Sequence, residues 1–147
     1  KHAQLATYND NSNGFGKSFD LVCAAASNCT EEAFLTDKGV SSMVISKEFP
    51  GAIKIQILDI FEHLKNTPID ILKIDIEGGE FSLLGDSRFK DLQARAIVLE
   101  YHVTKDKPDA RDWCQQRLSE FGYRVEAGAW DGPNNGFLWA YREPAMV

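Results

Sequence analysis

The spacing of hydrophobic and polar residues changes several times along the chain between a period typical of strands and one typical of helices. This pattern predicts strands that alternate with helices. Residues 52–58 alternate between apolar and polar side chains, as a strand with one solvated face does. Short and almost continuous apolar runs at 19–26, 69–76 and 94–101 are typical of buried strands. A shorter strand is predicted at 30–36.

Two short helices are predicted in the middle of the chain. Asp59 stands where an N-cap residue should, and apolar residues at helical spacing follow it until Pro68. A second helix is predicted at 77–84, and we expect Gly85 to end it in the left-handed conformation.

The last third of the chain predicts a longer helix followed by a hairpin. Residues 106–122 carry apolar side chains on one helical face, with Pro108 in the first turn and Gly122 just past the end. Residues 123–130 and 136–142 read as two strands joined by a short, turn-rich link, which is typical of an antiparallel hairpin. The order of elements therefore favours a single α/β domain with a mostly parallel sheet and an antiparallel C-terminal hairpin.

Composition narrows the classes of partner. The 147-residue chain carries 16 Lys and Arg against 22 Asp and Glu, a net charge of −6, and it has no basic run. We therefore expect no nucleic-acid partner, because such proteins cluster basic residues on one face. No apolar stretch approaches the roughly 20 residues that span a bilayer, so no membrane partner is expected either. The three cysteines lack C-x-x-C spacing, which fits a reducing compartment and a cytoplasmic protein.

Residues 69–84 contain the strongest sign of chemistry, because an apolar strand there runs into acids, paired glycines and a new helix. Ligands of open α/β sheets collect outside the carboxyl ends of the strands, where Asp75, Glu77 and Glu80 should lie. Gly78 and Gly79 let a backbone or a ligand approach closely, since they carry no Cβ. The two glutamates have an alternative interpretation as acids that stabilise the start of a helix. Asp75 fits that alternative poorly, because it ends a strand that should be buried.

The segment Asp70-Ile-Leu-Lys-Ile-Asp-Ile-Glu-Gly-Gly-Glu80 resembles the signature of FkbM-type S-adenosylmethionine-dependent methyltransferases. Shorter pieces follow the order of that family: Ala24-Ala25-Ala26-Ser27, Ser41-Ser42, Leu58-Asp59, Ile97-Val98-Leu99-Glu100-Tyr101 and Gly122-Tyr123. The resemblance implies a Rossmann-like class I methyltransferase sheet with the strand order 3-2-1-4-5-7-6.

The same resemblance implies that the first two strands of that sheet are absent from these residues. The family begins with a strand, a glycine-rich turn and an acid that hold the cofactor, and the only G-x-G, at Gly14 to Gly16, does not follow a strand. We therefore expect residues 1–147 to form a partial domain that lacks an N-terminal segment. Two alternatives are that strand 19–26 pairs directly with strand 69–76, or that a partner chain fills the gap.

The resemblance also assigns roles to individual residues. Asp75 would lie near the methyl group and the amine of S-adenosylmethionine, and Ser27 and Asn28 would contact the cofactor from the end of an earlier strand. Glu77 and Glu80 would orient a small-molecule acceptor with a hydroxyl group. Either Glu100 or His102, at the end of the neighbouring strand, would accept the proton; a solvated His102 or an ion-paired Glu100 is the structural alternative.

Two further functions remain open from the sequence. One is a non-catalytic binding or assembly module that kept the fold and lost the cofactor pocket. The other is a divalent-metal site formed by Asp75, Glu77, Glu100 and His102, since oxygen-rich ligand sets suit hard cations. Nothing in the spacing requires a metal, and our expectation is a site without one.

Overall fold

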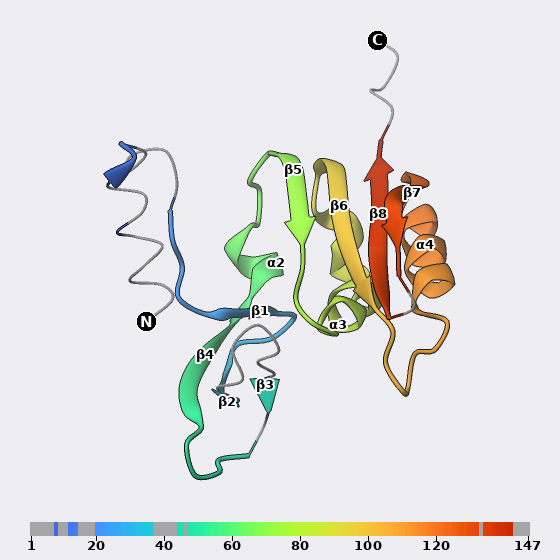
Figure 1. Cartoon of the computed structure of the whole chain (residues 1–147). Coiled ribbons are helices and arrows are strands. Elements are labelled where there is room, and N and C mark those ends of the chain that lie inside the picture. The colour runs from blue at the N-terminus through green and yellow to red at the C-terminus, as the bar shows by residue number, and fades with distance from the viewer. Residues whose placement is uncertain are drawn as a thin grey trace.

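The structure, a computed structural model, describes residues 8, 12–14, 20–36, 44, 45, 47–132 and 134–142 (Figure 1). This part of the chain contains two four-stranded sheets and several short helices. The strands are β1 (Ala25–Ser27), β2 (Glu31–Leu35), β3 (Val44–Ile45), β4 (Ile53–Asp59), β5 (Ile69–Ile74), β6 (Ala94–His102), β7 (Arg124–Asp131) and β8 (Asn135–Tyr141). The helices are α2 (Ile60–His63), α3 (Glu80–Gly85), the 3₁₀ helix η2 (Ser87–Asp91) and α4 (Ala110–Glu120).

The second sheet has the strand order β5-β6-β8-β7. Strand β5 pairs in parallel with β6, while β6 with β8 and β7 with β8 are antiparallel. The β7–β8 pair is the predicted C-terminal hairpin, with a register shift between Ala127 and Asp131. This order equals the 4-5-7-6 half of the order that the family resemblance implies.

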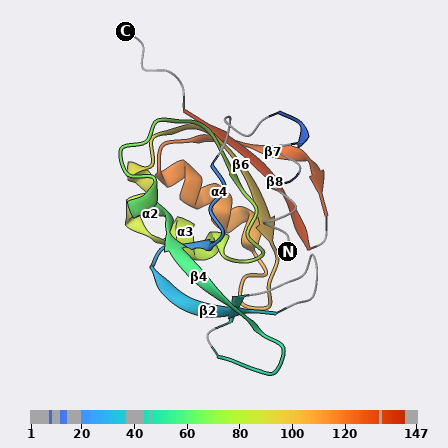
Figure 2. The ribbon, with the colours of Figure 1, turned by 90° about the vertical axis from the view of Figure 1, so that its left-hand side faces the viewer.

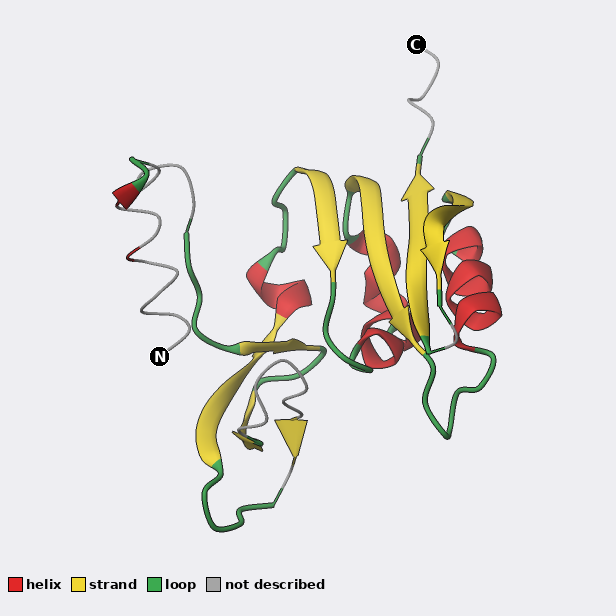
Figure 3. Cartoon of the chain, in the orientation of Figure 1, coloured by secondary structure: helices red, strands yellow, loops and turns green. Residues whose placement is uncertain are grey.

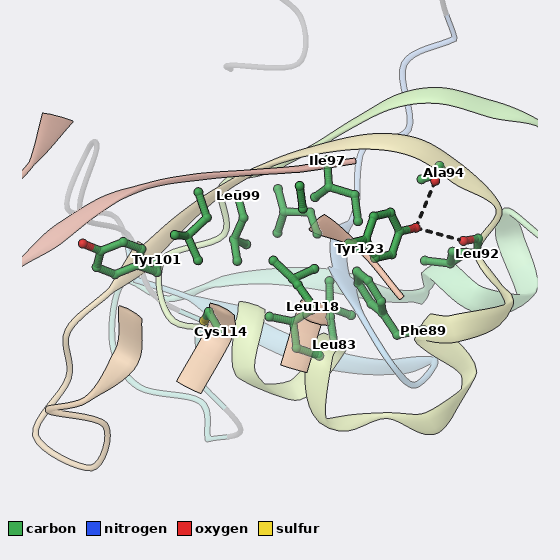
Figure 4. Packing of buried hydrophobic residues seen from close by; sticks show 14 of the residues in the cluster. Leu83, Phe89, Leu92, Ala94, Ile97, Leu99, Tyr101, Cys114, Leu118 and Tyr123 are labelled. Atoms are coloured by element: carbon green, nitrogen blue, oxygen red, sulfur yellow. Dashed lines mark hydrogen bonds between the residues drawn. The ribbon is translucent and has the colours of Figure 1, made fainter. Parts of the chain in front are cut away.

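The hydrophobic core lies between this sheet and its helices. Burial alternates along β6, so that Ile97, Leu99 and Tyr101 face the helices and each is at most 3% exposed. Figure 2 shows α4 lying along that face, and Figure 4 shows the side chains that fill the space between them. The Tyr123 hydroxyl contacts the carbonyl oxygens of Ala94 and Leu92 at 3.0 and 3.5 Å, which fixes the start of β6 against the end of α4.

The opposite face of the second sheet carries exposed apolar side chains. Ile71 is 70% exposed and Trp139 is 51% exposed. In the described strands, β5 is also the end member of its sheet, with β6 as its only neighbour. This part of the molecule therefore presents both an apolar surface and an unpaired strand edge.

The first sheet has the order β1-β4-β2-β3 and is mixed (Figure 3). Strands β1 and β4 are parallel, whereas β2 runs antiparallel to both β4 and β3. Among the described pairs only β1–β4 and β5–β6 are parallel, so the prediction of a mostly parallel sheet is wrong. The link at residues 28–30 is too short for the crossover that a parallel return would need, and β2 therefore reverses direction.

The earliest predicted strand is shorter and less buried than expected. The strand begins at Ala25, while Leu21 and Val22 are 46% and 48% exposed; residue 19 lies outside the described residues. Since β1 pairs with β4 and not with β5, direct pairing of strand 19–26 with strand 69–76 is also wrong.

Most other predicted elements are confirmed with shifted boundaries. The strand predicted at 30–36 is β2, and the Asp59 carboxylate caps α2 by accepting from the backbone N–H groups of Phe61 and Glu62. Helix α4 begins after Asp109, so Pro108 precedes its first turn, and Gly122 follows its end with φ +85°. Among the described helices, none is long and apolar enough to cross a membrane.

Helix α3 differs more from its prediction. It begins at Glu80 instead of residue 77, because Glu77 and Gly78 have φ values of 48° and 93°, which a right-handed helix does not accommodate. Gly85 is the last helical residue, is not among the glycines with positive φ, and is followed by Asp86 as C-cap, so the left-handed ending is wrong.

Candidate functional site

A cavity of about 710 Å³ opens where the two sheets approach each other, beside the end of β5 and the start of α3. The first sheet contributes apolar residues and Ser27, and the second part of the chain contributes Glu77, the two glycines after it and loop residues beyond β6. The lining residues are Ala24, Ala25, Ala26, Ser27, Val44, Ile57, Ile76, Glu77, Gly78, Gly79, Ser82, Thr104 and Asp106. Its volume lies in the range of pockets that bind small molecules.

The glycine turn between β5 and α3 shapes one wall of this cavity. The positive φ of Gly78 aims its N–H at Glu80 Oε2, 2.8 Å away, and the Gly79 N–H donates to the carbonyl oxygen of Ile76 at 3.0 Å. A Cβ on Gly79 would lie only 3.2 Å from that same oxygen. Both glycines therefore serve the tight turn that ends the strand.

Glu80 is the buried anchor of the site. It is 0% exposed, and its Oε1 accepts from the backbone N–H of His102 at 2.8 Å and lies 3.3 Å from His102 Nδ1. The carboxylate thus ties the first residue of α3 to the last residue of β6. This position differs from an exposed acid at a helix start, and it shields Glu80 from direct contact with a ligand in the cavity.

The imidazole of His102 lies among three carboxylates. Its Nδ1 faces Glu80, and its Nε2 lies 3.7 Å from Glu77 Oε2 and 3.8 Å from Glu100 Oε1. Glu100 also accepts from Asn135 Nδ2 at 2.8 Å, which fixes it from the neighbouring strand β8. The adjacent parallel ends of β5 and β6 therefore bring together four of the five predicted catalytic side chains.

Asp75, the fifth, belongs to the same group and is exposed, as Glu77 is. A carboxylate oxygen of Asp75, a carboxylate oxygen of Glu77 and a ring nitrogen of His102 all lie within 4.8 Å of one another. The Asp75 side chain is 38% exposed and its Oδ2 pairs with Lys73 Nζ at 2.6 Å. The buried strand end expected for Asp75 is therefore not found, because alternation places it on the exposed face with Lys73 while Ile74 enters the core.

Ser27 and Asn28, the two residues predicted to contact the cofactor from the end of an earlier strand, lie in different surroundings. Ser27 lines the cavity, but Asn28 is not among its lining residues. Instead Asn28 Nδ2 contacts Asp86 Oδ2 at 3.4 Å, and the Asn28 carbonyl oxygen accepts from Arg88 Nη2 at 2.7 Å. Asn28 therefore belongs to a junction between the sheets.

Arg88 is the centre of that junction. Its guanidinium donates to both carboxylate oxygens of Asp86 and, at 2.8 Å, to Oδ2 of Asp59. These hydrogen bonds from Arg88 lower the pKa of Asp86 to about 2. Because Asp59 ends β4 and Asp86 precedes η2, the arginine joins the end of a strand of the first sheet to the segment between α3 and β6.

Three polar residues of the cavity lining, Ser82, Thr104 and Asp106, carry no motif that would predict them from the sequence. The last two, however, lie in the loop that follows β6, where the same strand-end rule that singled out His102 would have placed them. That loop is held by a bridge between Thr104 and Lys107, and Lys107 Nζ lies 4.6 Å from the ring centroid of Trp113 on α4.

The buried thiol near the site is not a candidate nucleophile. Cys114 is 0% exposed, and burial, reinforced by the charge of Glu80, raises its pKa to about 12. Nucleophilic cysteines require the thiolate, so Cys114 acts as an apolar core residue.

Comparison with known proteins gives one positive result. The family model described as the methyltransferase FkbM domain matches residues 10–125 of the 147-residue chain. No curated protein and no solved structure matches the chain. The matched range includes β5, the glycine turn, β6 and α4, so it contains both walls of the cavity and the acid–histidine cluster. The chain therefore belongs to the methyltransferase FkbM domain family.

Proposed function

We propose that the chain takes part in S-adenosylmethionine-dependent methyl transfer to a hydroxyl group of a sugar or another small molecule. The observation that carries the proposal is the cavity at the end of β5, with Glu77 in its wall and Glu100 and His102 beside it. Membership of the FkbM family supports the reaction class.

The cavity lining fits the cofactor chemically. Its charged lining residues are Glu77 and Asp106, and neither Lys nor Arg is among the lining residues that the structure describes. A sulfonium cation and an amino group are stabilised by carboxylates nearby, and the apolar side chains of Ile57 and Ile76 suit an aromatic ring. When bound, S-adenosylmethionine would supply an electrophilic methyl group on sulfur.

The residues of the chain would align the acceptor and remove its proton. As the acceptor oxygen bonds to the methyl carbon and the carbon–sulfur bond breaks, the hydroxyl proton has to leave. His102 Nε2 and Glu100 Oε1 lie 3.8 Å apart, and Nε2 lies 3.7 Å from Glu77 in the cavity wall, so we assign either His102 or Glu100 as the acceptor of this proton. Glu80 would act as a positioning residue, because it fixes the orientation of the imidazole.

We also propose that the exposed edge and apolar face of the second sheet are covered by a further segment or chain. Ile71 and Trp139 are the observations that support this, because so much apolar surface beside an unpaired strand is an aggregation hazard. The alternative is a non-catalytic module that uses this surface for assembly.

Calorimetric titration with S-adenosylmethionine tests the proposal, with the chain itself and with the full gene product that contains it. We expect the full gene product to bind, and Asp106→Asn to weaken binding at least several-fold by removing a cavity carboxylate. Asp109→Asn is the matched control, since Asp109 lies three residues further on and makes no capping hydrogen bond to α4. Absence of binding in both proteins would contradict the proposal and favour the assembly module.

A further inference from the structure

We infer that Asp75, Glu77 and His102 form a binding site for one divalent transition-metal cation of the Mn²⁺ type. Each of these residues offers one ligand atom, and the three atoms all lie within 4.8 Å of one another. The inference rests on the geometry of these side chains and does not depend on methyl transfer.

The orientation of His102 is the first step. A carboxylate can only accept hydrogen bonds, so the contact of 3.3 Å between Glu80 Oε1 and His102 Nδ1 assigns the ring proton to Nδ1. In the neutral ring with this tautomer, Nε2 carries the lone pair, and it lies on the side of Glu77 and Glu100. A carboxylate that holds one ring nitrogen while the other faces an acidic cluster is the arrangement that orients histidine ligands in metal sites.

The surroundings of Nε2 are the second step. Glu77 Oε2 lies 3.7 Å from it, which is too far for a good hydrogen bond. Two ligands of the same cation, each roughly 2.1 Å from it, lie about 3 to 4 Å apart. The separation of these two atoms is therefore that of two ligands with a cation between them.

Asp75 completes the group from the exposed side. Its Oδ2 pairs with Lys73, but the side chains of Lys73 and Asp75 are 59% and 38% exposed, and exposed pairs of this kind are weak. A carboxylate has a second oxygen, so Asp75 can bind a cation while keeping or exchanging its contact with Lys73. Glu100 is not a member of this cluster, and its Oε1 accepts from Asn135 Nδ2 at 2.8 Å.

The ligand types select the class of cation. One imidazole nitrogen with two carboxylates favours Mn²⁺ over Ca²⁺, which prefers oxygen ligands alone. Three protein ligands leave coordination positions open, and Glu77 also lines the cavity, so those positions would face the space where a small molecule binds. With Nε2 bound to the cation, Glu100 would remain as the proton acceptor of the reaction proposed above.

The test is titration of the chain with MnCl₂ by calorimetry, with electron paramagnetic resonance of the free aqueous ion as a second readout. We expect one site per chain, with affinity reduced at least ten-fold in Asp75→Asn and in Glu77→Gln. Asp70→Asn is the matched control and should bind as the parent chain does. Asp70 is an exposed aspartate of β5, the strand that leads to Asp75, and its side chain pairs with Arg95. Circular dichroism of each variant checks that the fold is retained.

Absence of binding at millimolar Mn²⁺ would overturn the inference, as would equal affinity in the parent, Asp75→Asn and Glu77→Gln. Neither result bears on the methyl-transfer proposal. The titration with S-adenosylmethionine is carried out with a chelator present, so it measures cofactor binding without a divalent cation. Conversely, failure to bind S-adenosylmethionine leaves the Mn²⁺ result unchanged.

Discussion

Individual acids near the end of β5 differ in their surroundings, although the sequence places them only a few residues apart. Glu80 is 0% exposed, whereas the side chains of Glu77 and Asp75 are 50% and 38% exposed. The rule that functional residues gather at strand ends predicts Glu100 and His102 near these acids, and the adjacent parallel strands β5 and β6 do bring them together. Glu80 differs from Glu77 because its side chain points into the interior. Its burial was not predictable, because Oε1 of Glu80 is held by the backbone N–H and the ring of His102, which is 22 residues away.

Glu80→Gln tests the structural role of this carboxylate. The amide has one acceptor oxygen in place of two, so either the N–H of Gly78 or that of His102 loses its acceptor. We expect the free energy of unfolding to fall by about 1–3 kcal/mol, measured by urea denaturation. Glu62→Gln, an exposed glutamate on α2 paired only with Lys65, should change it by less than about 0.5 kcal/mol.

A loss in Glu80→Gln no larger than that in Glu62→Gln would contradict the assignment of Glu80 as a buried anchor. The variant also separates anchoring from ligand contact. Because Glu80 is not among the residues that line the cavity, its effect on ligand binding should follow the loss of stability and the displacement of His102.

Element boundaries were predictable where a local signal decides them. Asp59 caps α2 through its own side chain, and the period of α4 is set by the residues within it. The start of α3 depends instead on two consecutive residues with positive φ, Glu77 and Gly78. A glutamate in that conformation gives no sign in the sequence, so the helix was placed three residues too early.

The two glycines that flank α3 provide a matched pair of substitutions. Gly78 has φ +93°, so Gly78→Ala should lower the free energy of unfolding by about 1–2 kcal/mol through backbone strain. Its Cβ would meet nothing closer than Thr104 Cγ2 at 3.8 Å, so steric conflict adds little. Gly85 is helical, and a Cβ there would have no neighbour within 4 Å, so Gly85→Ala should be neutral or stabilise by up to about 1 kcal/mol.

Thermal or urea denaturation of both variants measures the difference. Equal effects would mean that the conformation of the turn after β5 is not as described, because the two substitutions add the same methyl group at opposite ends of one helix. A clear loss in Gly85→Ala alone would restore the left-handed helix ending that the sequence predicts.

The architecture of the whole molecule was predictable in its second half only. Long apolar strands, a clear helix and a short hairpin link predict the elements of this half, and the order β5-β6-β8-β7 is the one that the family resemblance implies. The first sheet consists of strands of two to seven residues, whose pairing is decided by turns and partners remote in sequence. Asn28 illustrates the limit, since its contact with Arg88 spans 60 residues.

Arg88 therefore provides the test of how the two sheets are joined. Arg88→Met removes the cation from between Asp59 and Asp86, whose side chains are only 12% and 15% exposed. We expect the free energy of unfolding at pH 7 to fall by about 2–3 kcal/mol, because two largely buried carboxylates lose their partner. Arg95→Met removes the exposed pair with Asp70 and should cost less than about 1 kcal/mol.

The pH dependence gives the same test an independent readout. Arg88 lowers the pKa of Asp86 from its ordinary value of 3.8 to about 2 in the folded protein, so the unfolded chain binds more protons between these values. The contribution of the pair is therefore complete above about pH 4 and is lost as the pH falls towards 2. Because the Arg88 side chain is 38% exposed and solvent screens its charge, we expect a contribution of about 1–2 kcal/mol.

Urea denaturation at pH 7, 5, 4 and 3 should then show a constant difference between the parent chain and Arg88→Met down to about pH 4 and a smaller difference at pH 3, while the difference between the parent and Arg95→Met stays constant. Parallel curves for Arg88→Met would mean that its loss of stability comes from packing against Phe61, whose ring centroid lies 4.6 Å from the guanidinium carbon, and not from the carboxylates. Convergence would show that Arg88 stabilises the fold through the charge of Asp86, which fixes the guanidinium where it also reaches Asp59 at the end of β4.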